Sequence, residues 1–142
     1  MTPSIHEIFD KFDRATTKDA RINVLRTYAN PTFIQFLQKV FDENVKFYTN
    51  KFPDLYQEPE NMMPGIEYST IHQELKRTYL FEVDNPAGQA LPIEKRNLLL
   101  TQILESLHPR EADFFVRMMA KNLKVKYLTP NLIKEALPGI LS

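Results

Sequence analysis

The sequence predicts an all-α protein, with residues 1–142 forming one compact domain of about six or seven helices. Apolar residues recur over most of the chain at the three- and four-residue spacing of an amphipathic helix. Proline also repeatedly follows a residue that can cap a helix. It suits the first helical turn because the amide it lacks would have no partner there. Four helix starts are marked in this way: Thr2-Pro3, Asn30-Pro31, His108-Pro109 and Thr129-Pro130.

Three amphipathic helices are expected before residue 42. The first runs from Pro3 to about Phe12, the second starts at Thr16 or Thr17, and the third starts at Pro31. In each of them the apolar residues fall on one stripe, which should face the core. The side chains expected in the core are Ile5, Ile8, Phe9, Phe12, Ile22, Val24, Leu25, Phe33, Ile34, Leu37, Val40 and Phe41.

Prolines interrupt the middle of the chain. Residues 50–65 contain three prolines, which forbid a continuous helix and predict a long loop. A fourth helix is expected from Ser69. The run from Tyr79 to Val83 has the composition of a strand, but continuation of the helix is favoured. A second loop should occupy residues 84–92. The fourth helix is expected to bury Ile71, Leu75, Thr78 and Tyr79.

The last third of the chain predicts three further helices. They start at Pro92, Pro109 and Pro130, and the last ends at Leu137 because Pro138-Gly139 stops it. The first two should supply much of the core. The side chains expected there are Ile93, Leu99, Leu100, Ile103, Leu104, Leu107, Ala112, Phe115, Val116, Met119, Ala120 and Leu123.

Composition excludes several kinds of chemistry. The chain has no cysteine, so it has no disulfide, no thiolate metal site and no cysteine nucleophile. Its three glycines are too few for a loop that cradles phosphates, and its three histidines are far apart in the sequence and match no metal-binding spacing. We therefore expect a non-enzymatic protein with no cofactor, no metal and no small-molecule substrate.

Hydropathy predicts no membrane anchor. No apolar run approaches the roughly 20 residues that a membrane-spanning helix needs. Glu7 and Asp10 interrupt the N-terminal segment, which therefore lacks the apolar core of a signal peptide. We expect a cytoplasmic protein, in the host cytoplasm if its source is viral.

Charge is balanced overall but unevenly distributed. The 18 basic and 18 acidic residues give a net charge of zero. Residues 54–94 hold eight acids and two bases, whereas residues 117–142 hold five bases and one acid. This asymmetry suits either solvated faces or a basic binding surface near the C-terminal end.

The segment FFVRMMAKNLKVKYLTPNLIKEALPGILS, which begins at Phe114, resembles a known protein family. It is similar to the end of the N-terminal, helical DNA-binding domain of ATP-dependent DNA ligases, most nearly those of T-even-type bacteriophages. The shared order is an arginine-bearing helix, a turn, and a final helix ending in Pro-Gly. The order of features from Thr17 to Pro53 is also similar, whereas residues 54–91 match poorly. In the turn, where the family usually has a glycine, this chain has Lys126-Tyr127.

The resemblance implies sequence-independent binding of duplex DNA, nicked duplexes included, through its phosphates and minor groove. The basic residues would neutralise phosphates, and Thr129 would cap the last helix so that its amides meet a phosphate. The residues expected to meet DNA are Lys18, Arg21, Arg117, Lys121, Lys124, Lys126 and Thr129.

Two alternatives stay open. One is a phage-type protein-interaction module that kept the ligase-domain fold without DNA binding. Its partner would be a replication or host protein, and its partner face would be Asp54–Glu67 with Met62-Met63. The other is a fragment of a ligase, since a ligase would continue past Ser142 into its catalytic domains.

We predict that the chain forms no covalent adduct with AMP and seals no nick. The ligase family carries its adenylated lysine in a K-x-D-G motif, and the nearest string here, Lys11-Phe12-Asp13-Arg14, lacks the glycine. Incubation with labelled ATP and magnesium, followed by denaturing electrophoresis, checks this. A labelled protein band would contradict it.

Overall fold

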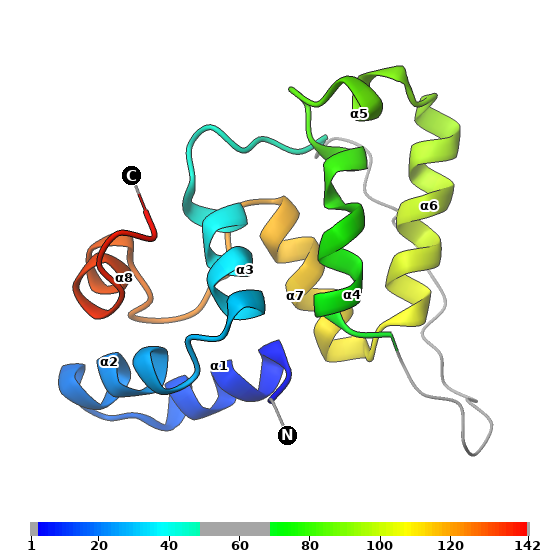
Figure 1. Cartoon of the computed structure of the whole chain (residues 1–142). Helices are drawn as coiled ribbons and strands as arrows, with labels where there is room; N and C mark the ends of the chain where they lie inside the picture. The colour runs from blue at the N-terminus through cyan, green and yellow to red at the C-terminus, as the bar shows by residue number, and fades with distance from the viewer. Residues whose placement is uncertain (1–2, 49–68, 142) are drawn as a thin grey trace, which may run out of the picture.

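The computed structural model describes residues 3–48 and 69–141, and these residues form an all-α fold (Figure 1). Within them 66% of the residues are helical, and no strand longer than an isolated bridge occurs. The helices are α1 Ile5–Arg14, α2 Lys18–Thr27, α3 Pro31–Phe41, α4 Ile71–Glu74, the 3-10 helix η1 Leu75–Phe81, α5 Pro86–Ala90, α6 Ile93–Ser106, α7 Pro109–Met119 and α8 Pro130–Ala136.

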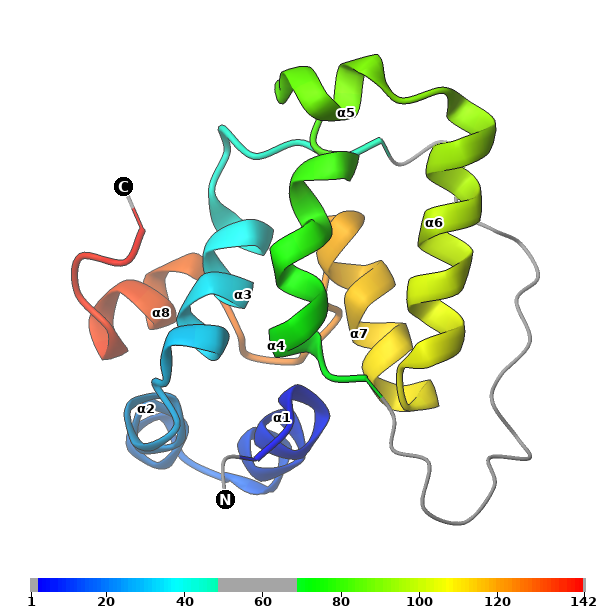
Figure 2. The same ribbon diagram turned by 45° about the vertical axis from the view of Figure 1, so that its right-hand side comes forward.

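Helix α7 lies at the centre of the arrangement and packs against α1, α3 and α6. Helix α2 packs against α1 and α8. In both views α4 with η1 stands beside α6, α5 lies across the end of this pair, and α8 lies on the other side of α3 (Figures 1 and 2). The predicted fold class is therefore confirmed, and one core joins the helices of the described residues except α5, whose buried residue is Gly88.

The predicted caps start most of the helices where the sequence places them. Thr17 accepts a hydrogen bond from the amide of Ala20, and Asn30 from the amide of Phe33. At the other end of the chain Thr129 accepts from the amide of Leu132. These side chains take up amides that have no partner inside their own helices, which is why the helices begin there.

The first helix begins later than predicted. It starts at Ile5 with Ser4 as its cap, not at Pro3. The backbone amide of Ser4 donates to the Glu7 carboxylate at 3.2 Å, so Ser4 and Glu7 form the reciprocal pair of a capping box. This pair outweighs the preference of proline for a first helical turn.

The core is built around phenylalanine rings. Phe9 of α1 stacks on Phe114 of α7 with centroids 4.9 Å apart, and it meets Phe33 of α3 edge-on at 5.7 Å. Burying one such side chain contributes about 1.5–3 kcal/mol. Three distant helices are therefore joined through one ring.

Some core predictions are wrong, for identifiable reasons. Tyr79 is 44% exposed and Phe81 is buried instead. In η1 the chain repeats every three residues, so Leu75, Thr78 and Phe81 share a face. Ile93, 56% exposed, stands at the first position of α6, on its solvent side.

Other predictions need smaller corrections. Phe36 is buried although it was not expected, since it follows Phe33 by three residues on the same stripe. Ala120 ends α7 and is exposed. The expected loop at 84–92 contains α5, which starts at the Asn85 cap. The expected loop at 50–65 and the segment Asp54–Glu67 lie outside the described residues.

Acid should weaken the junction between α1 and α7 through Asp10. Both oxygens of Asp10 accept from Arg110, each at 2.7 Å, and these hydrogen bonds lower the pKa of Asp10. A carboxylate with a lowered pKa in the folded state adds stability above its unfolded value of about 3.9, and that stability is lost as pH falls through the folded pKa.

We therefore expect the urea concentration at the unfolding midpoint to fall as the pH is lowered from 5 to 3. This fall should be less steep in Asp10→Asn. Asp84→Asn is the matched control, because Asp84 is exposed and makes no ion pair with a described residue. If the urea midpoint fell equally steeply with pH in the wild type and in Asp10→Asn, the contact between Asp10 and Arg110 would not be the acid-sensitive one.

Candidate nucleic-acid interface

The residues expected to meet DNA fall into two groups in the structure. Four of them surround Tyr127 between α2 and the start of α8: Lys18, Arg21, Lys126 and Thr129. Lys124 lies three positions before Tyr127 in the turn that leads to α8. The other two, Arg117 and Lys121, are engaged inside the fold. We call the first group together with Tyr127 the Tyr127 face: Lys18, Arg21, Lys124, Lys126, Tyr127 and Thr129.

Tyr127 holds the centre of this face. Its side chain is 54% exposed, and the guanidinium carbon of Arg21 lies 3.9 Å from its ring centroid. The Lys126 ammonium lies 5.1 Å from the same centroid. Both distances lie within the range of a cation–π interaction, which positions the cation without using its hydrogen-bond donors. Arg21 and Lys126 therefore keep their donors for a ligand.

Two shallow hollows flank the ring. The first, of about 330 Å³, lies between α2 and α8 and includes Lys18 and Thr129. The second, of about 390 Å³, lies against the end of α1 and includes Asp13. Lys18 pairs with Glu135 at 2.9 Å, and both side chains are more than half exposed. The face thus sets four cations against two carboxylates, a modest positive excess.

The turn that carries the face adopts left-handed backbone without glycine. The φ angles are 58° at Lys121, 55° at Lys124 and 70° at Tyr127. This conformation costs roughly 1–2 kcal/mol for a residue with a Cβ. Three such residues within seven positions therefore need support from their surroundings.

Lys121 provides part of that support. Its ammonium donates to the backbone oxygens of Lys39, Asp42 and Val45, at 3.1, 2.6 and 2.6 Å, where α3 ends. Burial lowers the pKa of this ammonium, and nearby Asp42 acts in the opposite direction. Its donors are engaged within the fold, so we leave Lys121 out of the interface.

Arg117 is held in a similar way. It pairs with Asp113 at 2.8 Å and donates to the backbone oxygen of Leu123 at 3.0 Å. These bonds connect α7 to the turn that follows it. Thr129 acts as the cap of α8 and takes the amide of Leu132, so that amide is not offered to a ligand.

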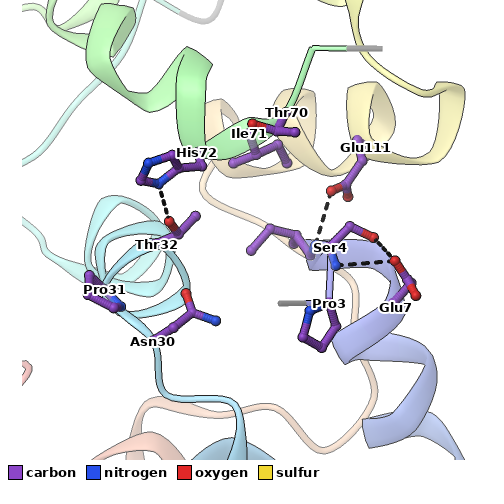
Figure 3. A pocket seen from close by; sticks show the side chains of 11 residues that line it. Pro3, Ser4, Glu7, Asn30, Pro31, Thr32, Thr70, Ile71, His72 and Glu111 are labelled. Atoms are coloured by element: carbon purple, nitrogen blue, oxygen red, sulfur yellow. Dashed lines mark hydrogen bonds between the residues drawn. The ribbon is translucent and has the colours of Figure 1, made fainter. Parts of the chain in front are cut away.

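A larger pocket than these hollows lies elsewhere, where the first turns of α1, α3 and α4 meet α7 (Figure 3). It measures about 470 Å³. Buried Glu111 accepts from the amides of Ile5 at 3.0 Å and His6 at 2.8 Å, while Thr32 is hydrogen-bonded to His72. Among the described residues no lysine or arginine lines the pocket. Its polar groups are matched to one another, so we regard it as a structural junction.

Sequence reasoning missed Tyr127 and Glu111 as positioning residues. Tyr127 stands in a Lys-x-Lys-Tyr string, which signals an aromatic beside cations, but nothing in the string identifies Arg21 as its partner. Glu111 follows a helix-starting proline and looks like an ordinary acid in a first turn. Its partners are more than 100 positions away.

The described residues contain no cluster of three or more His, Cys, Asp or Glu that could hold a metal ion. In the same residues no helix has the length and apolarity needed to cross a membrane.

Comparison with known families gives one match. Residues 8–125 match the family described as Family of unknown function (DUF6433). Comparisons with curated proteins and with solved structures gave no match.

Replacing Lys121 by methionine should destabilise the fold. The change removes a charged donor shared by three backbone oxygens, which corresponds to roughly 1.5–3 kcal/mol of unfolding free energy. Urea denaturation followed by circular dichroism measures the loss.

Lys124→Met is the matched control, because Lys124 has nearly the same φ, is exposed, and makes no side-chain hydrogen bond to a described residue. We expect it to change the stability by less than about 0.5 kcal/mol. Equal losses in both variants would show that the three oxygens do not depend on Lys121.

Proposed function

The chain belongs to the DUF6433 family, and we propose that it binds duplex DNA without regard to sequence, through phosphates contacted by the Tyr127 face and without a catalytic step of its own. One observation carries the proposal. Arg21 and Lys126 both lie against the Tyr127 ring, Lys124 is exposed three positions earlier in the same turn, and none of the three pairs with a carboxylate of a described residue.

The chemistry of the face suits a polyanion backbone. The Arg21 guanidinium is stacked on Tyr127, so the edges of its planar fork can donate to phosphate oxygens. The two lysines act as point charges on the same turn. Binding of this kind releases condensed counterions and needs no contact with base edges.

Lys18 can join this set on binding. Its ion pair with Glu135 is exposed, and such pairs contribute about 0–1 kcal/mol, so exchanging Glu135 for a phosphate costs little. Four cations would then contact DNA. The zero net charge of the chain leaves no long-range attraction beyond this face, which favours weak binding.

The backbone of the turn supports the likeness to ligase DNA-binding domains. A glycine in that family permits a positive φ where the chain approaches the minor groove, and Lys124 and Tyr127 adopt a positive φ here. The turn can therefore follow a similar path, with lysine and tyrosine side chains added to it.

Duplex binding should be weak and steeply dependent on salt. With three or four phosphates neutralised, log K should fall against log salt with a slope of about −3 to −4. Lys124→Ala and Lys126→Ala should each reduce the slope by about one unit without changing sequence preference. Fluorescence anisotropy with intact and nicked duplexes at several salt concentrations gives the slopes.

Lys76→Ala is the control, since Lys76 is an exposed lysine on η1, away from the Tyr127 face. It should leave the slope unchanged. Undetectable binding at low salt would overturn the proposal and favour the protein-interaction module. Binding with an unchanged slope in both variants would place the DNA surface elsewhere on the chain.

A further inference from the structure

Far from the Tyr127 face lies a buried arginine that pairs with no carboxylate of the described residues. Arg96 of α6 is only 7% exposed. Its Nη2 donates to the backbone oxygens of Gly88 at 2.6 Å and Leu91 at 3.0 Å, and its guanidinium stacks over the Tyr48 ring at 3.8 Å. Its Nε is buried and has no hydrogen-bond partner among residues 3–48 and 69–141.

Within the described part of the chain this arrangement leaves the charge of Arg96 without a counter-charge. Among the described residues Arg96 makes no ion pair, and Nη2 is the one nitrogen of its guanidinium that finds an acceptor. Removing a charge from water is costly unless it is paired and its donors are satisfied. Two carbonyl dipoles and an aromatic face meet this need only in part.

The two carbonyls are held firmly in place. Helix α5 packs so closely on η1 that a Cβ on Gly88 would lie 2.9 Å from the backbone oxygen of Glu82. The Gly88 oxygen therefore has a fixed position, and Nη2 is committed to it. The Nε and Nη1 donors cannot turn toward these carbonyls without giving up the existing bonds.

A pocket of about 450 Å³ opens beside the guanidinium. Its walls are largely apolar, and Phe81, Leu91 and Leu100 line it together with Arg96 and Tyr48. Exposed Gln89 and Ile93 stand at its rim, so it is reached from solvent. None of the described residues that line it is acidic.

The same pocket receives the start of α6. Pro92 occupies the cap position of this helix of 14 residues and offers no side-chain acceptor. The first amides of α6 therefore add a partial positive charge to that of Arg96. Two independent features favour an anion at one place: a buried cation that no carboxylate of a described residue pairs with, and a helix start without a side-chain cap.

We propose that this pocket binds a carboxylate attached to an apolar group. The carboxylate pairs with Arg96 beside the start of α6, and the apolar group packs against Phe81, Leu91 and Leu100. A single buried guanidinium matches one negative charge, and the apolar walls would desolvate a phosphate dianion without balancing its second charge. Both a free acid and the C-terminus of a peptide with an apolar last residue have this chemistry.

The test compares charged and neutral probes on the full chain. Isothermal titration with 3-phenylpropanoate should give at least tenfold tighter binding than with 3-phenylpropanamide, which has the same shape and no charge. Amide resonances of residues 88–97 should shift in a ¹H–¹⁵N spectrum. Equal affinity for acid and amide, or binding of neither, would overturn the proposal.

A pair of variants on α6 locates the site. Ile93→Glu puts a negative charge at the rim and should weaken binding of the acid at least fivefold, because like charges repel. Leu98→Glu is the control, since Leu98 is 57% exposed against 56% for Ile93 and does not line the pocket. Equal weakening in the two variants would overturn the proposal.

Arg96→Lys tests the guanidinium itself. The variant retains the positive charge but loses the planar guanidinium with its paired N–H donors. Affinity for the acid should therefore fall, while the weak binding of the amide is unchanged. Circular dichroism checks that the variant is folded. An unchanged affinity for the acid would overturn the proposal.

A tripeptide ending in phenylalanine, with a free or an amidated C-terminus, then distinguishes the two sources of the carboxylate, a free acid and the C-terminus of a peptide. Tighter binding of the free-carboxylate peptide than of 3-phenylpropanoate identifies a peptide C-terminus, and the reverse order identifies a free acid.

Discussion

The arrangement of this protein depends on one buried carboxylate. Glu111, in the first turn of α7, accepts the first two amides of α1 and so serves as the anion at the start of a distant helix. Those amides would otherwise lie unpaired against the core, at a cost of about 1–3 kcal/mol each. Because α2 follows α1 after a short turn and carries Lys18 and Arg21, the position of the Tyr127 face follows from this contact as well.

A second polar contact, made by a cation, holds the other side of that face. Lys121 ties the end of α7 to the end of α3 and keeps the following turn in its left-handed course. The turn then presents Lys124, Lys126 and Tyr127 outward. A buried acid and a half-buried lysine thus position a set of exposed cations, and neither of the two belongs to the binding surface itself.

Much of the fold could be predicted from the sequence, because its signals are local. Caps such as Thr17, Asn30 and Thr129 act on amides three positions away, and the apolar stripes repeat at the helical period. The exchange of Tyr79 for Phe81 in the core was not predictable, since the choice between a 3-10 and an α-helix depends on what packs against the segment.

The candidate sites were less predictable, because they depend on charges far apart in the chain. Arg117 and Lys121 look like their exposed neighbours in the sequence, and only the folded chain brings backbone acceptors to them. Arg96 lies on the buried side of a helix whose sequence alone suggests a solvated base. Tyr48, which stacks on it, comes from the segment that follows α3, far from Arg96 in the sequence.

The pairing of early and late segments also determines when the fold can form. Ile5 and Glu111 are 106 positions apart, and Arg26 of α2 donates to the backbone oxygen of Ala136, 110 positions later. At about 5–20 residues per second, a ribosome needs about 5–20 s to add the residues that separate such partners. During this interval α1 and α2 expose their apolar stripes without their partner helices. The nascent N-terminal third therefore has to stay soluble through its own charges, and Lys11, Arg14 and Asp19 are available for this before they belong to any folded surface.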